Sequence, residues 1–190
     1  HKAGTAVSDC HNDSCPGDAR SFIRTGEDDP SLVTEDMFVD AIKNLRVQAA
    51  SGPFVTMNVG EAEIGDTADL GGDGSFKLHV KVQAPTWMPL DWIRVVVNGD
   101  IVAAVDADQL QSGVVRYDSS FDLTVDKDSW IVVLAGAPQK RLAPVSPSQP
   151  VLTIANPIFV DLEGDGYEAP GLPDADHAAA AFAALAALSQ

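Results

Sequence analysis

Val95-Val96-Val97-Asn98-Gly99-Asp100-Ile101-Val102 is the stretch that decides the fold class. Two runs rich in β-branched residues flank an Asn-Gly pair, the strongest short-range signal for a two-residue type I′ turn. The stretch therefore predicts a β-hairpin with strands over residues 91–97 and 100–105.

Alternation of apolar and polar residues continues on both sides of this hairpin. Further candidate strands cover residues 47–50, 54–59, 75–83, 114–125, 130–135 and 151–160. About eight short strands without helices over roughly 110 residues are typical of an antiparallel β-sandwich of immunoglobulin-like size. Trp92 and Trp130 lie inside strand patterns and are expected in the core, whereas Trp87, between two prolines, is expected at the surface.

Residues 1–46 have a different pattern. Ala6-Val7 is expected to end a strand, and Ser21–Arg24 to form a second short strand after a Gly/Asp/Ser-rich loop. Thr34 is suited to cap a helix that ends near Arg46, since its apolar residues fall on one face. The sequence thus predicts a short α/β segment over 1–46, a mainly β domain over 47–168, and an Ala-rich helical tail over 169–190.

Charge and cysteine content limit the classes of function. The 190 residues carry a formal net charge of −16, which argues against binding to nucleic acid or to anionic membranes because like charges repel. Cys10 and Cys15 allow three interpretations: a small-loop disulfide, part of a soft metal site, or free thiols. We favour the disulfide, which indicates a secreted or periplasmic protein.

Ser8-Asp9-Cys10-His11 is the stretch with the clearest chemistry. A carboxylate and an imidazole two residues apart supply ligands that Zn²⁺, Mn²⁺ or Fe²⁺ accept. The alternative is an Asp that caps a turn beside a solvated His.

Several short motifs follow one another in a characteristic order: Ser8-Asp9-Cys10-His11, Gly17-Asp18-Ala19-Arg20, Ser51-Gly52-Pro53-Phe54-Val55, Val97-Asn98-Gly99, and Asn156-Pro157-Ile158-Phe159-Val160-Asp161. This succession resembles the C-terminal half of the carbaryl-hydrolase-like metallohydrolases, a branch of the PHP (polymerase and histidinol phosphatase) superfamily. The resemblance covers residues 1–168. It implies that Asp9 and His11 are metal ligands at the end of a barrel strand and that Arg20 faces the substrate.

The same resemblance implies a partner and a substrate for the chain. Most ligands of a PHP-type site come from strands that precede the S-D-x-H element, so the expected partner is an N-terminal part of the PHP domain. Residues 1–46 would then be a remnant of that barrel, the 190-residue chain would be inactive alone, and the substrate would be a small-molecule ester or carbamate.

Asp161-Leu162-Glu163-Gly164-Asp165-Gly166 spaces its carboxylates Asp161, Glu163 and Asp165 as in the first half of a calcium loop. The bidentate Glu of a complete loop is missing, because residue 172 is Leu. Ordinary Asp-Gly turns are the competing interpretation.

Two functions from different classes therefore remain. The first is the C-terminal portion of a metal-dependent hydrolase of phosphoesters, carboxyl esters or carbamates. The second is a secreted, non-catalytic β-sandwich that binds glycan or protein and is stabilised by calcium.

Overall fold

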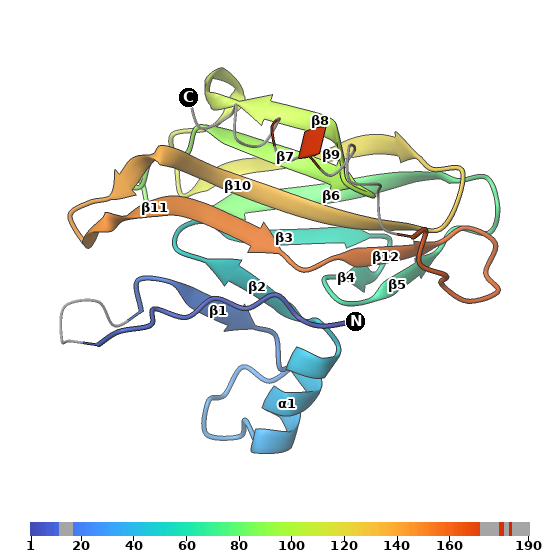
Figure 1. Cartoon of the computed structure of the whole chain (residues 1–190), viewed down its shortest axis with the longest axis horizontal. Coiled ribbons are helices and arrows are strands. Elements are labelled where there is room, and N and C mark those ends of the chain that lie inside the picture. Colours follow the sequence, from blue (N-terminus) through green and yellow to red (C-terminus); the bar gives the residue numbers. More distant parts are fainter. Residues whose placement is uncertain (12–16, 172–178, 181–182, 184–190) are drawn as a thin grey trace.

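The computed structural model describes residues 1–11, 17–171, 179–180 and 183. Cys15 and most of the predicted tail helix lie outside the described residues. The described part is mainly β, with two sheets and one short α-helix (Figure 1). None of its helices is long and apolar enough to cross a membrane.

The elements follow in chain order: β1 (Arg20–Ile23), α1 (Glu35–Lys43), β2 (Val47–Ala50), β3 (Phe54–Val59), β4 (Ala62–Glu63), β5 (Thr67–Asp69), β6 (Ser75–Gln83), β7 (Trp92–Val97), β8 (Asp100–Asp106), the 3₁₀ turn Ala107–Gln109, β9 (Val115–Thr124), β10 (Ser129–Leu142), β11 (Ser146–Ala155) and β12 (Ile158–Asp161). The small sheet has the order β4-β3-β6-β9. The large sheet has the order β1-β2-β11-β10-β12-β5, and β7 pairs with both β10 and β8.

The two sheets share one hydrophobic core. Alternate residues of β3 and β6 face inward from the small sheet, and Val55 and Val80 have no exposed surface. Val95 of β7 and Val133 of β10 meet them from the large sheet and are equally buried. In β3 and β6 the period of two in the sequence thus corresponds to one buried and one more exposed face, whereas β7 and β12 are buried at every position.

The Asn-Gly hairpin is confirmed. Asn98 has φ 53° and Gly99 has φ 103°, the positive values that a type I′ turn requires at both central residues. The turn joins β7 and β8, whose register pairs Val97 with Asp100.

The expectation of purely antiparallel pairing is wrong at one ladder. β5 pairs with β12 in parallel, with Phe159 opposite Thr67 and Asp161 opposite Asp69. The chain reaches this position because β5 leaves the small sheet after β4 and joins the edge of the large one. Neither β4 nor β5 was predicted, since runs of two and three residues are too short to show a period.

The predicted strand over 151–160 is also two strands, β11 and β12. Pro157 has no N–H to donate to a ladder, and Asn156 beside it turns its side chain away to bind Gly4 and Val47 carbonyl oxygens at 2.8 and 2.7 Å. The chain changes neighbours at this point.

The N-terminal region adjoins the large sheet rather than standing apart. β1 pairs antiparallel with β2, matching Arg20 to Ala50 and Ile23 to Val47, and the N-terminal segment runs beside β1 (Figure 1). Ala6-Val7 belongs to no strand, contrary to the expectation from sequence. α1 begins after Thr34, whose hydroxyl accepts from Met37 N–H at 3.3 Å, as predicted for its N-cap.

Candidate functional site

Asp9 and His11 lie side by side at the end of the N-terminal segment. The His11 Nε2 atom is 3.4 Å from Asp9 Oδ1, and both side chains are 86% exposed. Asp9 has φ 47°, a left-handed conformation that Asp tolerates better than most residues. The pair therefore presents a carboxylate oxygen and an imidazole nitrogen to the outside.

Hydrogen bonds hold the segment that leads to this pair. Gly4 N–H donates to Asn156 Oδ1 at 2.8 Å, and Ala6 exchanges two bonds with the Ser21 hydroxyl at 3.0 and 2.9 Å. Cys10 is disulfide-bonded. Its predicted partner, Cys15, lies outside the described residues, so the pairing stays a prediction.

The described residues contain no group of three or more His, Cys, Asp or Glu side chains placed to hold a metal ion. Arg20, at the start of β1, directs its guanidinium over the Phe22 ring, 5.7 Å from the centroid. Its predicted role toward a substrate stays a prediction.

The Asp161 loop is organised by backbone hydrogen bonds. Asp161 is buried, and its two carboxylate oxygens accept from Gly164 and Gly166 N–H at 2.7 and 2.8 Å. Glu163 and Asp165 are exposed. The Asp161 carboxylate thus bridges the N–H groups of a tight Gly-containing loop, and calcium binding stays a prediction.

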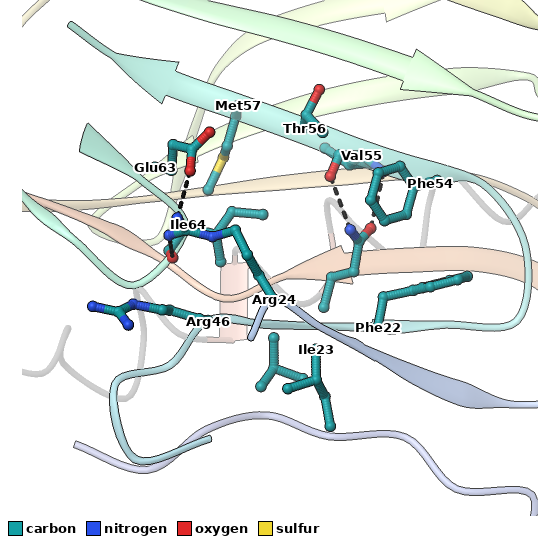
Figure 2. A pocket seen from close by; sticks show the side chains of 12 residues that line it. Phe22, Ile23, Arg24, Arg46, Phe54, Val55, Thr56, Met57, Glu63 and Ile64 are labelled. Carbon is teal, nitrogen blue, oxygen red and sulfur yellow. Dashed lines mark hydrogen bonds and ion pairs between the residues drawn. The ribbon is translucent and has the colours of Figure 1, made fainter. Parts of the chain in front are cut away.

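An apolar pocket was not predicted. A pocket of about 280 Å³ lies between β1 and β2 of the large sheet and β3 and β4 of the small one (Figure 2). Its lining is mostly apolar: Phe22, Ile23, Val47, Phe54, Val55, Met57 and Ile64, with Gln48, Thr56, Arg24, Arg46 and Glu63. Phe22 and Phe54 meet edge to face with centroids 5.1 Å apart.

Gln48 closes one side of this pocket. Its side-chain oxygen accepts from Val55 N–H and its amide donates to the Val55 carbonyl, both at 2.9 Å. The amide thus pairs with β3 as a neighbouring strand would, and β4 pairs with β3 only at Asn58 and Val59.

Ion pairs form the rim at the opposite side. Arg24 contacts Glu63 at 2.5 Å and Asp66 at 3.2 Å, and it donates to the Ile64 carbonyl at 3.1 Å. Arg46 makes longer contacts, 3.5 Å to Asp40 and 3.7 Å to Asp66, and its Nε has no hydrogen-bond partner among the residues that the structure describes. Figure 2 shows the contact between Arg24 and Glu63 beside Ile64 and Met57.

One signal in the sequence could have indicated this pocket. Gln48 interrupts the apolar run of β2, and a buried amide needs partners within reach. Arg24 and Arg46 gave no such signal in the sequence. Each lies at the end of a different predicted element, and only the folded structure shows how close these two elements are.

Comparisons with protein-family models, with curated proteins and with solved structures give no match for this chain.

Proposed function

We propose that this chain forms the C-terminal part of a metal-dependent hydrolase in which Asp9 and His11 are two of the metal ligands. The substrates would be phosphoesters, carboxyl esters or carbamates. The metal, Zn²⁺, Mn²⁺ or Fe²⁺, would supply a water of lowered pKa and polarise the scissile group.

The exposed Asp9–His11 pair is the observation that carries this proposal. The donor chemistry fits a divalent transition metal, because one carboxylate and one imidazole are available 3.4 Å apart. A catalytic metal keeps about three protein ligands or more, and the described residues offer no third one nearby. The remaining ligands would therefore come from an N-terminal part of the PHP domain.

Apolar side chains exposed in the first forty residues support such a partner. Val7 is 75% exposed, Leu32 57% and Phe38 43%. In α1, Phe38 and Val39 are exposed, whereas Met37 and Ile42 are partly buried and Ala41 is buried. A packed neighbour would remove this surface from water.

We also propose the type of sandwich, the origin of residues 1–46 and the cellular compartment. The two facing sheets fit an immunoglobulin-like sandwich over residues 47–168, to which β1 of the proposed barrel remnant over 1–46 adds an edge strand. The disulfide of Cys10 fits an oxidising compartment, hence a secreted or periplasmic protein.

Metal binding by the chain tests the role of Asp9 and His11. We expect weak Zn²⁺ or Mn²⁺ binding in calorimetric titrations, lost in Asp9→Ala and in His11→Ala because each removes one of two ligands. His79→Ala is the matched control, since His79 and Asp118 form a second exposed His–Asp pair at 2.9 Å. Equal loss in the control would contradict the proposal, because the binding would then be generic.

Activity provides the second part of the test. The chain alone should not hydrolyse p-nitrophenyl acetate or p-nitrophenyl phosphate, since it lacks the other ligands. Joined to a PHP-type N-terminal part, it should turn over, and Asp9→Ala should lower kcat by at least about 100-fold. Chelator-sensitive hydrolysis by the chain alone, or full activity of the Asp9→Ala enzyme, would overturn the assignment.

A non-catalytic binding module is the second candidate, and the loop before β7 favours it. Trp87 is 48% exposed, while buried Arg116 donates to the carbonyls of Pro85 and Met88 at 3.0 and 2.5 Å. A Trp on an anchored loop suits stacking on a sugar or a protein. Loss of glycan-array binding in Trp87→Ala would support this candidate, and an array without signal would contradict it.

A further inference from the structure

We propose that the pocket between β1, β2, β3 and β4 binds a small, uncharged, largely aromatic or aliphatic molecule. This site is separate from the Asp9–His11 pair and does not rest on the hydrolase proposal. Nothing in the motif succession pointed to it.

The side chains inside the pocket favour an apolar ligand. Ile23, Val47 and Met57 face it, and Phe22 and Phe54 form a wall of two rings. An aromatic ligand can pack against ring faces and edges with a gain beyond the burial of area. Phe54 is 37% exposed, so part of this wall is accessible from solvent.

The buried side-chain amide of Gln48 does not need a hydrogen bond from a ligand. Both functional atoms of Gln48 are bonded to the Val55 backbone. A ligand that carried a charge into this part of the pocket would lose its hydration without gaining a partner.

The charges at the rim exclude both signs of ion. Arg24 is already bonded to Glu63, Asp66 and the Ile64 carbonyl. An anion would meet the carboxylates of Glu63 and Asp66, and a cation would meet Arg24 and Arg46. The rim is therefore electrostatically balanced, and an uncharged molecule with at most one hydrogen-bonding group suits it best.

The volume sets the size of the ligand. Pockets for drug-sized molecules have about 300–1,000 Å³, and this one has about 280 Å³. A one- or two-ring body fits, whereas an oligosaccharide or a folded peptide does not.

Three naphthalene derivatives of one shape test the proposal: the 2-carboxamide, the 2-carboxylate and the 2-carboxamidinium. The full chain is titrated with each compound, and binding is measured by calorimetry and by amide NMR shifts. The carboxamide should show saturable binding. Both ions should bind at least about ten-fold more weakly, about 1.4 kcal/mol of binding free energy. No saturable binding of the carboxamide, or equal binding of all three, would overturn the proposal.

Two variants locate the binding in the pocket. Phe54→Ala removes one wall and should weaken carboxamide binding at least about five-fold, whereas Trp87→Ala, which removes an exposed aromatic elsewhere, should leave it unchanged. Ile23→Trp should reduce binding by filling the pocket, and its melting curve shows whether it is folded. Shifts outside β1–β4, or equal loss in Phe54→Ala and Trp87→Ala, would place the ligand elsewhere and contradict the inference.

Discussion

At the scale of single residues, Gly65 has a backbone position that no other residue fits. Its φ is +93°, and an added Cβ would overlap the Asn44 carbonyl oxygen and come within 3.0 Å of Arg46 N. Gly65→Ala should therefore lower the free energy of unfolding by more than about 3 kcal/mol, or prevent folding, in urea titrations.

Gly60 is the matched control, because it also has positive φ, +57°, but has open space around it. Gly60→Ala should cost only about 1 kcal/mol, the strain of a left-handed alanine. Similar losses for the two variants would contradict the argument from the close approach of Asn44.

Asp161 gives a second prediction at this scale. Asp161→Ala leaves the N–H groups of Gly164 and Gly166 without their acceptor and should cost about 2–4 kcal/mol of unfolding free energy. Asp165→Ala, in the same loop but exposed, should stay within about 0.5 kcal/mol. Thermal melts of both variants would check this, and equal destabilisation would show that the turn does not depend on Asp161.

The same two variants test the calcium loop. If the loop binds calcium, millimolar Ca²⁺ should raise the Tm of the native chain, and Asp165→Ala should abolish that rise. A Tm that does not respond to Ca²⁺ would contradict the calcium interpretation and leave a turn held only by Asp161.

At the scale of elements, the Gln48 side chain satisfies the Val55 N–H and carbonyl of β3, which a neighbouring strand would otherwise bind. Gln48→Leu keeps the volume but leaves the N–H and carbonyl of Val55 without partners, so we expect a loss of about 2–4 kcal/mol. Gln111→Ala, a glutamine exposed on the surface, should change stability by less than about 0.5 kcal/mol. Chemical denaturation of the two variants measures the difference, and a neutral Gln48→Leu would refute the role of the amide.

Elements were predictable where the sequence has a local period. β2, β3 and β6 have the expected bounds, and the Asn98-Gly99 turn has the expected type. β5 was not predictable, because its three residues gain their place only from β12, far along the chain. The pocket was missed for the same reason: its walls come from four strands, and its rim joins Arg24 and Arg46 with acidic residues that lie far from them in the sequence. Asp9 and His11 were singled out from local spacing, and their role as metal ligands stays a prediction.

At the scale of the whole molecule, two tyrosines make the stability of the folded state depend on pH in the alkaline range. Burial raises the pKa of Tyr167, and the charge of Asp128 adds to it. Burial also raises the pKa of Tyr117, against a smaller opposite effect of its hydrogen bond with Ser119. A raised pKa in the folded state gives stability that is complete below the unfolded value near 10 and is lost as pH rises through the folded pKa.

Tyr167→Phe should therefore reduce the loss of stability above about pH 10 relative to the native chain, and Tyr117→Phe should do the same. Urea titrations at neutral and alkaline pH would measure both, and absorbance at alkaline pH would follow the tyrosinates. An unchanged alkaline slope in both variants would contradict the assigned environments.

The contacts between the two ends of the chain have a consequence for the order of synthesis. β2 pairs with β11, β5 pairs with β12, and Gly4 binds Asn156 across 152 positions. A growing polypeptide exposes the edges of β2 and β5 until the ribosome has released the last strands. Such non-local pairing slows folding and leaves strand edges open to other chains. Until residues 146–161 have been translated, the nascent protein therefore depends on protection from aggregation.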